Sequence, residues 1–341
     1  MSTITVIITT HNLEKYLEQC LNGLLQQTIQ DFEILIVDDA STDETQNIIK
    51  KWVEKDSLKI KTIILDKNLG APGLVRNVAL ESDLIDGEYV LFLDGDDICK
   101  ENMLEKMYNA AKSSGSDTAK ADIVICAYKR VEQNTGKTLA VEMQGFPNEI
   151  TNPSENDRIA FINTAPWNKL WKKEIIQDLR FADYKAGEEV LFSYKAYRNS
   201  HRIVFINEPL IDYMVRKDSV ISNTDESTIW AFAESLKKEW LLSEKTDKLL
   251  ELIIFLHIGL SMALRAADNS DIYIHLYIQR IEKWFKNELN WFKANRLFSI
   301  SSLIKHGIKG IIIWLVFHMY KFHVFEFALF LYRKLKLNVK F

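Results

Sequence analysis

Residues 89–97 read Tyr-Val-Leu-Phe-Leu-Asp-Gly-Asp-Asp, and this stretch decides the fold. Five consecutive apolar residues, 89–93, are typical of a strand that is buried on both faces of a sheet. Three carboxylates follow within the next four residues, so the apolar run ends abruptly in charged, turn-forming sequence. Apolar strands that end in polar loops are typical of parallel sheets, in which those loops line a crevice at one edge.

The same alternation of strand and helix occurs upstream. Apolar, β-branched runs predict strands at 4–9, 32–37 and 61–65, and residues with helical spacing predict helices at 13–25, with Asn12 as N-cap, at 44–52 and at 73–81. A strand, a helix and a second strand in succession predict a right-handed βαβ unit and a parallel sheet, hence an α/β fold. We therefore expect Thr9–Asn12, Asp38-Asp39 and Asp94–Asp97 to converge on one crevice.

The acidic segments permit two interpretations each. Carboxylates as close as those of 94–97 repel one another, so a fold that keeps them together commonly neutralises them with Mg²⁺ or Mn²⁺ bridging a diphosphate. The alternative is an Asp-Gly turn that precedes a helix at 101–112. Asp38-Asp39 either bind a nucleobase or ribose, or cap the helix at 44–52. No Gly-x-Gly-x-x-Gly follows the first strand and no Walker A motif occurs, which excludes dinucleotide and P-loop sites.

Composition divides the chain into two parts. With 341 residues, 47% hydrophobic and 26% charged, it has enough apolar sequence for one or two compact units. Beyond about residue 228 the pattern is almost entirely helical, and no proline occurs after 209. We predict a catalytic domain over 1–228 and a helical region over 229–341. Residues 283–341 carry eleven basic and two acidic side chains, which indicates an anionic surface as a partner.

The apolar segment 311–332 has almost the length of a membrane span, but Lys321 and Glu326 interrupt it. We expect a helix that lies in the membrane interface, with contact to the catalytic unit or to a second subunit of a homo-oligomer as the alternative. The three cysteines are too few for a disulfide framework, and residues 1–6 lack the features of a secretory signal. The expected location is cytoplasmic, peripheral to the inner face of the cytoplasmic membrane.

Several segments together resemble the family-2 inverting glycosyltransferases with the GT-A fold, of the bacterial cell-surface polysaccharide type. The resemblance rests on four motifs that occur in order before residue 98, and it continues to about residue 225. The segments are Val6–Asn12, Glu33–Asp43, Asn68–Gly70 with Arg76-Asn77, Asp94–Asp97, Pro166–Trp171, Gly187–Phe192 and Tyr213–Ser219. It implies a Rossmann-like nucleotide-diphospho-sugar transferase domain followed by the all-α region.

The resemblance also implies a UDP-binding site. Thr9 and His11 would line the uracil pocket, although the family commonly has Tyr at the position of His11. Asp39 would hold the uracil, Asp38 would support that loop, and Arg76 would approach the base or the phosphates.

Further positions would bind the metal and the leaving group. Asp94 would face the ribose and diphosphate, and Asp96 would be the principal ligand of Mn²⁺ or Mg²⁺, with Asp94 beside it. Arg216 and Ser219 would belong to a loop that closes over the departing diphosphate.

Two further motifs concern the acceptor side. Glu188-Glu189 matches a family element that is more often Glu-Asp, whose second member is the general base, so Glu189 is the expected base and Glu188 the alternative. The alternative is a structural role, in which both glutamates are solvated in the first turn of a helix, where acidic side chains are favoured. Trp167, with Asn168 and Lys169 after it, either contacts a sugar ring or belongs to the core.

These observations predict a metal-dependent inverting glycosyltransferase. It would move a hexose or N-acetylhexosamine from a UDP-sugar to a hydroxyl of a glycan or lipid-linked glycan, with no nucleic-acid partner. The alternatives are a polyprenyl-phosphate glycosyltransferase and a catalytically silent scaffold subunit.

Overall fold

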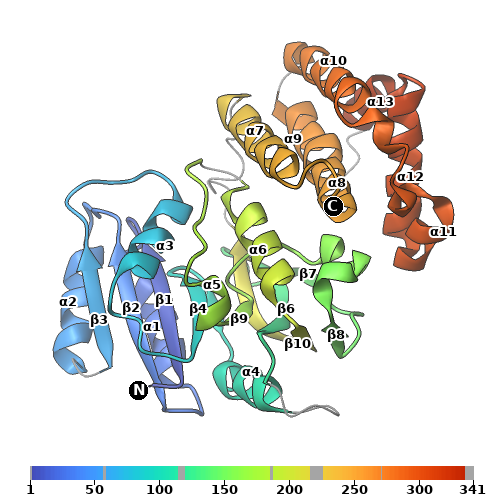
Figure 1. Cartoon of the computed structure of the whole chain (residues 1–341). Coiled ribbons are helices and arrows are strands. Elements are labelled where there is room, and N and C mark those ends of the chain that lie inside the picture. The colour runs from blue at the N-terminus through green and yellow to red at the C-terminus, as the bar shows by residue number, and fades with distance from the viewer. Residues whose placement is uncertain are drawn as a thin grey trace. The chain divides into compact units, whose positions relative to one another are not determined.

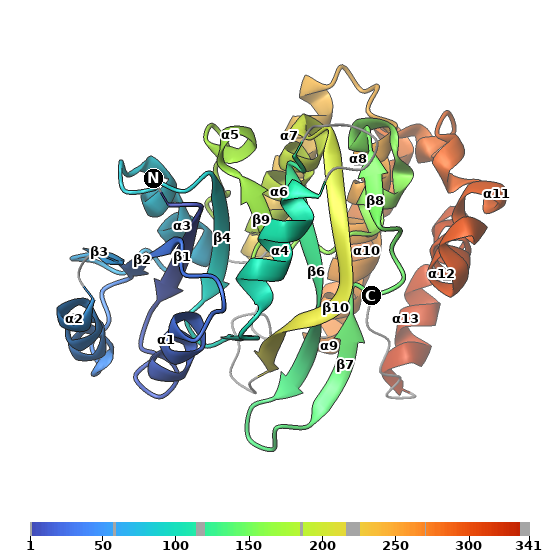
Figure 2. The same cartoon turned by 90° about the horizontal axis from the view of Figure 1, so that it is seen from below.

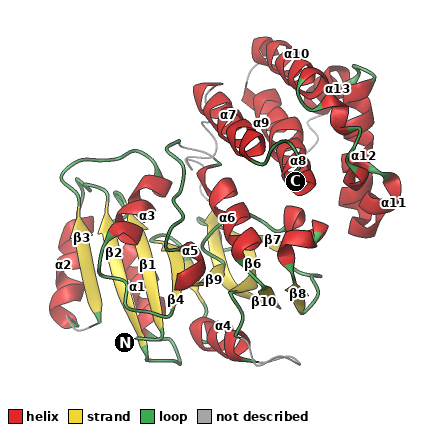
Figure 3. Ribbon diagram, viewed as in Figure 1, coloured by secondary structure: helices red, strands yellow, loops and turns green. Residues whose placement is uncertain are grey.

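The structure is a computed structural model that describes residues 2–56, 59–113, 120–184, 187–215, 226–269 and 271–334. Two compact units make up the chain, Met1–Asn223 and Thr224–Phe341. All described strands lie in the first unit, and the second is helical in its described residues (Figure 3). The predicted α/β domain with a C-terminal all-α region is therefore confirmed. The sequence had placed the division after residue 228.

The first unit is built on one mixed sheet (Figure 1). Its strand order is β3-β2-β1-β4-β9-β6-β10-β5, with β7 paired to β6 and β8 to β10. The first four strands of this order run parallel to one another, as predicted. The strands are β1 (Ile4–Thr10), β2 (Phe32–Asp38), β3 (Ile60–Ile64), β4 (Tyr89–Asp94), β5 (Ile98–Cys99), β6 (Ile123–Glu132), β7 (Thr138–Glu142), β8 (Glu149–Thr151), β9 (Lys169–Lys172) and β10 (Arg202–Val215).

Alternate residues of the central strands enter two different cores. Val6 and Ile8 of β1 pack in one apolar cluster with residues of α1 and α2, such as Leu21 and Trp52. On β4, Phe92 makes edge contacts with the rings of Phe181 and Phe192 instead. Both faces of the parallel strands are thus covered, which explains why they are apolar throughout. The helices of this unit are α1 (Leu17–Leu25), α2 (Thr45–Lys55), α3 (Pro72–Glu81), α4 (Met103–Lys112), α5 (Lys173–Ile176) and α6 (Glu188–Asn199).

One local prediction was wrong. Asn12 does not cap α1, because it has a left-handed φ of 53° and the helix begins only at Leu17. The segment 132–158, for which the sequence predicted no strand, contains β7 and β8, which pair antiparallel with the long strands β6 and β10 (Figure 2). Its polar composition reflects an exposed position at the margin of the sheet, since β7 has no buried residue.

The second unit has a core of aromatic side chains. Phe255 makes ring contacts with Phe285, Phe292, Phe317 and Tyr320. Phe255 itself lies in a π-helical segment, Phe255–Ser261, that joins two of the helices. The helices are α7 (Glu226–Leu242), α8 (Lys248–Ile254), α9 (Met262–Asn269), α10 (Asp271–Asn287), α11 (Ile300–Leu303), α12 (Gly307–Lys321) and α13 (Phe325–Lys334).

Two helical segments of this unit have the length and apolar composition of a membrane span, Lys248–Ala267 and Ile300–Lys321. Their environments differ, because the first is 72% buried within the protein and the second only 28%. The first is thus a core segment of the helical unit. The segment 311–332 is not a single helix: α12 ends at Lys321, and His323 has a left-handed φ of 56° before α13 begins.

Candidate functional site

The carboxyl ends of three strands meet at one point of the sheet. In the parallel register, Thr10 of β1 pairs with Asp38 of β2, and Thr9 pairs with Asp94 of β4. The side chains follow the backbone: Thr10 Oγ1 donates to Asp38 Oδ1 at 2.9 Å, and Thr9 Oγ1 to Asp94 Oδ1 at 3.4 Å. The predicted convergence of these strand ends is therefore confirmed, and it follows from the register of β1 between its neighbours.

Asp38 is fully buried and organises the loop that follows β2. Besides the hydroxyl of Thr10, its carboxylate accepts hydrogen bonds from Ser41 N, Ser41 Oγ and Gln46 Nε2, at 3.0, 2.5 and 3.0 Å. A buried carboxylate with this many donors has its charge compensated. No lone pair of this group needs a ligand, so Asp38 holds the loop in place. Gln46 was not singled out in the sequence, where it is one polar residue of an amphipathic helix.

Asp39 and His11 join this loop to the one that follows β3. Asp39 Oδ1 accepts a hydrogen bond from Leu69 N at 2.7 Å, and its carbonyl oxygen accepts one from His11 Nδ1 at 2.7 Å. With Nδ1 as donor, His11 Nε2 accepts from the amide of Asn68 at 3.1 Å. His11 and Asn68 are exposed, whereas Asp39 is buried. A planar ring and an amide are thereby presented at the surface beside Asp39, as a flat base requires.

The acidic turn after β4 divides its carboxylates between the interior and the surface. Asp97 is buried and accepts a hydrogen bond from Met214 N at 3.0 Å, which fixes the turn to β10. Asp94 and Asp96 are half-buried. Gly95 fits between them because a Cβ there would lie 3.0 Å from side-chain carbons of Leu13 and Thr10. The tight turn thus leaves Asp94 and Asp96 partly accessible and encloses Asp97.

Arg76 of α3 connects this turn to the start of α6. Its guanidinium donates to Asp94 Oδ1 at 2.7 Å and lies 3.5 Å from Glu188 Oε1. Only 4% of Arg76 is exposed, so the ion pairs form in a largely dry environment. Gly73 permits the close approach of the helices, since a Cβ there would lie 2.6 Å from Glu188 Cγ. In this arrangement Arg76 holds two carboxylates together, and its expected contact with the base or phosphates stays a prediction.

Glu188 and Glu189 have different environments although they are adjacent. Glu188 is buried, and desolvation, followed by the charge of Glu189, raises its pKa well above 4.5 despite the opposing charge of Arg76. Glu189 is half-buried and acts electrostatically on both Arg76 and Lys169. Of the two, Glu189 has the more accessible carboxylate.

The segment Trp167–Lys169 lies mostly behind the surface. Trp167 is 7% exposed and stacks on Tyr213, with the ring centroids 4.9 Å apart. Burial and the charges of Asp97, Asp94 and Asp96 raise the pKa of Tyr213, so this aromatic pair borders the acidic turn. Sequence inspection did not single out Tyr213 as a site residue, although it lies three positions before Arg216.

Asn168 and Lys169 differ from the expectation that they contact an acceptor. Neither has any exposed surface. Asn168 Nδ2 donates to Cys126 O at 2.8 Å, and Lys169 Nζ donates to Asn163 Oδ1 and Asn168 Oδ1, both at 2.8 Å, and to Ala165 O. Burial lowers the pKa of Lys169 well below its usual range. Both side chains support the loop around Trp167 from the interior, because their polar atoms are occupied by protein acceptors and donors.

The carboxylates of the turn match the ligand preference of a hard divalent cation. Within the described residues, no group of three or more His, Cys, Asp or Glu side chains is arranged to hold a metal ion by itself. Asp94 and Asp96 supply carboxylate oxygens, and Mg²⁺ and Mn²⁺ bound by one or two carboxylates take phosphate oxygens and water as their remaining ligands. The donor set thus fits a metal that binds together with a diphosphate. Arg216 and Ser219, the other expected leaving-group contacts, lie outside the described residues.

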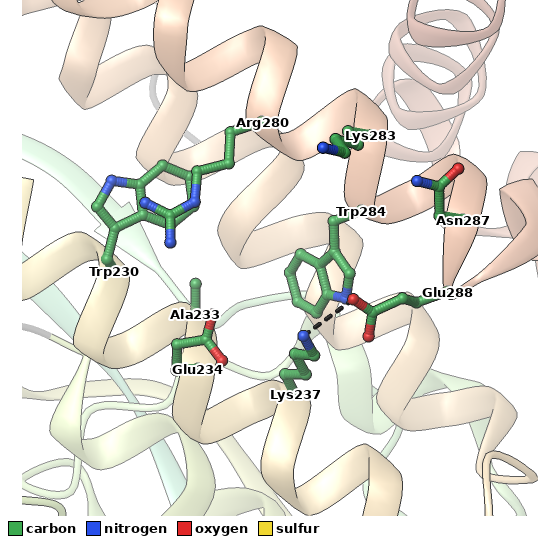
Figure 4. Close-up of a pocket in the computed structure, with 9 residues that line it drawn as sticks. All are labelled: Trp230, Ala233, Glu234, Lys237, Arg280, Lys283, Trp284, Asn287 and Glu288. Atoms are coloured by element: carbon green, nitrogen blue, oxygen red, sulfur yellow. Dashed lines mark hydrogen bonds and ion pairs between the residues drawn. The ribbon is translucent and has the colours of Figure 1, made fainter.

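A separate pocket of about 290 Å³ lies in the helical unit, between α7 and α10 (Figure 4). It is lined by Trp230, Arg280 and Trp284, among others, with the guanidinium of Arg280 3.7 Å from the ring centre of Trp230. An ion pair between Lys237 and Glu288, 2.9 Å apart, closes one side. Arg280 is stacked, and Lys237 and Glu288 are paired, within the wall, and the pocket lacks the converging carboxylates of the strand ends.

Comparison with known proteins is consistent with this geometry. The family model described as glycosyl transferase family 2 matches residues 5–178, which include β1 to β4 and the acidic turn. This chain belongs to glycosyl transferase family 2. It is a glycosyltransferase, and the resemblance identified from the sequence motifs is confirmed.

Named relatives and solved structures extend the comparison. The family 2 chain is 30% identical over 240 residues to glycosyltransferase GlyG of Streptococcus pneumoniae, covering 67% of this chain and 75% of GlyG. It is 32% identical over 223 residues to the poly(ribitol-phosphate) beta-N-acetylglucosaminyltransferase TarS of Staphylococcus aureus, covering 64% of this chain but 36% of TarS. The crystal structure of S. aureus TarS 1-349 in complex with UDP superposes with a TM-score of 0.67 and 25% identity, covering 94% of this chain and 92% of that one.

Replacing Arg76 by Ala should destabilise this glycosyltransferase. The change leaves the carboxylate of Asp94 without its counter-ion and removes the polar partner of Glu188 in a largely buried setting, which costs about 3 kcal/mol of unfolding free energy. Urea unfolding at neutral pH measures the loss. The control is Lys106→Ala, which removes a solvent-exposed ion pair with Glu208 and should cost less than about 1 kcal/mol. Equal losses in the two variants would contradict the role assigned to Arg76.

The raised pKa of Glu188 predicts a specific pH dependence of stability. Above its ordinary pKa of 4.5 the unfolded chain releases the Glu188 proton while the folded chain retains it, so the group's stabilising contribution is lost as pH rises through the folded pKa. The difference in unfolding free energy between the wild type and Glu188→Gln should therefore decrease between pH 4 and neutral pH. Denaturant titrations at several pH values give this difference. A constant or increasing difference would show that Glu188 is ionised like an ordinary glutamate.

Proposed function

We propose that this chain transfers a hexose or N-acetylhexosamine from a UDP-sugar to a hydroxyl of a glycan or lipid-linked glycan acceptor, with inversion. The observation that carries the proposal is the convergence of three groups at one edge of the sheet. These are the Asp38-Asp39 loop, the carboxylates of Asp94 and Asp96, and the Glu188-Glu189 pair, which is joined to Asp94 through Arg76. A transferase needs a site for the nucleotide, then one for the diphosphate, and then one for the acceptor next to the sugar. The three groups would supply these sites in that order.

The site would bind the nucleotide through its loops. The exposed ring of His11 and amide of Asn68, held against Asp39, offer a stacking face and hydrogen-bond groups for a uracil. The crystal structure of the S. aureus TarS fragment with UDP, at 25% identity, supports UDP as the nucleotide. TarS and GlyG are glycosyltransferases by name, and TarS acts on poly(ribitol-phosphate). These relatives support a cell-surface glycopolymer as the acceptor class.

Asp96, with Asp94, would hold Mn²⁺ or Mg²⁺ together with the diphosphate. Such an ion, when bound, supplies positive charge that compensates the negative charge developing on the UDP leaving group. The chain's own contribution is to fix Asp94 through Arg76 and to keep Asp96 at the surface beside it. The two carboxylates are thereby presented to the ligand in a fixed position before it binds.

Glu189 is the general base of the proposed reaction. The acceptor oxygen forms a bond to the anomeric carbon while the bond from that carbon to the diphosphate oxygen breaks, and its electron pair leaves with UDP. The hydroxyl proton of the acceptor passes to the carboxylate of Glu189, which is half-exposed and therefore accessible to a solute. Glu188 is buried between Arg76 and Gly73 and positions the helix start instead.

The variant Asp96→Ala should lose metal-dependent nucleotide binding. Wild-type protein with Mn²⁺ and UDP at 100 times the dissociation constant should gain about 2.7 kcal/mol of stability, seen as a raised melting temperature. Asp96→Ala should show no Mn²⁺-dependent increase. Asp86→Ala, which removes an exposed carboxylate paired with Lys61, is the matched control and should retain it. A full Mn²⁺-dependent increase in Asp96→Ala would remove the metal assignment. The same measurement with UDP-glucose, UDP-galactose and their N-acetylamino forms identifies the donor.

The variant Glu189→Gln should reduce turnover by about 10²–10⁴-fold while UDP affinity is unchanged, because only the proton acceptor is lost. Turnover is measured as sugar transfer to a lipid-linked or polyol-phosphate glycan. The donor is the UDP-sugar that the melting-temperature experiment identifies. Glu188→Gln is the matched control with the same chemical change one residue away. A loss confined to Glu188→Gln would reassign the base. Strong activity of the double variant would favour an acceptor that is already an anion, such as a polyprenyl phosphate.

A further inference from the structure

The described part of the helical unit exposes a group of large apolar side chains on its last two helices. Ile308 is 77% exposed, Phe322 71% and Phe327 64%. We call this group the apolar face; its members are Ile308, Ile311, Leu315, Phe322, Phe327, Phe330 and Leu331. Single exposed apolar residues are common on protein surfaces, but seven large ones within 24 residues, on two successive helices and the turn between them, indicate an interaction site.

Helix α12 is apolar on two opposite sides. Ile308, Ile311 and Leu315 recur at intervals of three and four residues and are exposed, so they share one side of the helix. The opposite side, with Ile313 and Phe317 among others, is buried in the core of the unit. Its end is fixed there as well, because Tyr320 donates to Gly259 O at 2.6 Å. α12 already buries one apolar side in the core of the unit. Its exposed apolar side is therefore a second surface that the core of the unit does not require.

Helix α13 repeats this division. Phe325 and Leu329 are buried, four residues apart, whereas Phe327, Phe330 and Leu331 on the other side are exposed. α12 and α13 adjoin in sequence and meet at the turn between them, where the ring centroids of Tyr320 and Phe325 lie 4.5 Å apart. Two successive helices therefore each bury one apolar side and expose the other.

Cationic side chains accompany the apolar face. Residues 300–334 contain five basic side chains and one acidic side chain. The acidic one, Glu326, is hydrogen-bonded to His275 at 2.8 Å. Exposed Lys305 and Lys309 stand near the start of α12, and exposed Arg333 and Lys334 near the end of α13. The apolar face is thus bordered by positive charge at both ends.

We propose that the apolar face binds the surface of a membrane that contains anionic lipids, with α12 and α13 lying in the interface. Apolar side chains would enter the boundary between headgroups and acyl chains, and the flanking cations would contact anionic headgroups. An in-plane position follows from length and packing. The span-like segment Ile300–Lys321 is not one regular helix, because Gly307 has a left-handed φ of 66° at the start of α12. α12 itself has 15 residues, about 22 Å at 1.5 Å per residue, which is shorter than the roughly 30 Å hydrocarbon core. One side of α12 is also occupied by protein along its length.

A second copy of this chain fits the apolar face less well. In a symmetric dimer the same patch from both copies would meet, so the cations at its margin would be brought together. Like charges brought together at an interface oppose association, whereas the same cations attract an anionic membrane. The charge therefore distinguishes the two occupants in favour of lipid. This inference does not depend on the identity of the sugar donor.

Co-sedimentation of the full chain with vesicles tests the proposal. Wild-type protein should bind vesicles of equal parts phosphatidylcholine and phosphatidylglycerol, bind pure phosphatidylcholine vesicles much less, and dissociate as salt is raised. The double variant Ile308→Glu/Phe327→Glu should reduce the fraction of protein bound to vesicles by on the order of tenfold or more. Two apolar side chains that would enter the membrane are replaced by negative charges, which the anionic headgroups repel. Lys309→Gln should reduce binding about fivefold, and only with the anionic vesicles.

The matched control is Leu242→Glu, which introduces the same charge at a 70% exposed leucine of α7, outside the apolar face. It should bind vesicles like the wild type, and all variants should keep the wild-type circular dichroism spectrum. Equal binding to both kinds of vesicle, or an equal loss in Leu242→Glu, would overturn the proposal. A third result would also overturn it: the wild type does not bind vesicles, light scattering shows it to be a dimer, and the variant Ile308→Glu/Phe327→Glu is a monomer. That result would assign the face to a second copy.

Discussion

The site depends on one buried guanidinium. Arg76 lies between Asp94, at the end of β4, and Glu188, at the start of α6, two residues that are 94 positions apart in the chain. Carboxylates from the acidic turn and from α6 would otherwise repel each other at the same edge of the sheet. A single buried cation joins them, and the absence of a side chain at Gly73 lets α3 come close enough to place it. The proposed donor and acceptor sides of the site are connected through this contact.

Burial separates the roles of neighbouring carboxylates. In the pairs Asp96-Asp97 and Glu188-Glu189, one member is enclosed by protein and the other is nearer the surface. Asp97 fixes the turn through Met214 N while Asp96 faces outward, and Glu188 is enclosed with Arg76 while Glu189 is half-exposed. An enclosed carboxylate that accepts a hydrogen bond from a distant backbone stabilises a turn, whereas an accessible one can meet a ligand or a proton. The same residue type thus serves structure and chemistry one position apart.

The helical unit shows that hydropathy alone does not decide the fate of a segment. Lys248–Ala267 is the more apolar of the two span-like segments, and it forms the core of the unit. Ile300–Lys321 is slightly less apolar but keeps a full side of α12 exposed. The difference lies in how much of each segment the rest of the unit covers. This is a property of the packing, because the apolar periodicity of a helix does not show whether its second apolar side meets other helices of the same unit.

The sequence by itself determined that the first four strands form a parallel sheet, the edge at which their polar ends meet, and the positions that form the acidic turn. These follow from local patterns: apolar runs long enough for a buried strand, helices between them, and the handedness of βαβ units. It also determined the family, because four motifs in order are specific. The extra strands β7 and β8 escaped it, since exposed strands have no apolar signal. Tertiary structure alone decided which carboxylate of each pair is buried, that Asn168 and Lys169 point inward, and that α12 exposes one side. Each of these depends on neighbours distant in sequence, and burial is a property of the assembled neighbours rather than of any one residue.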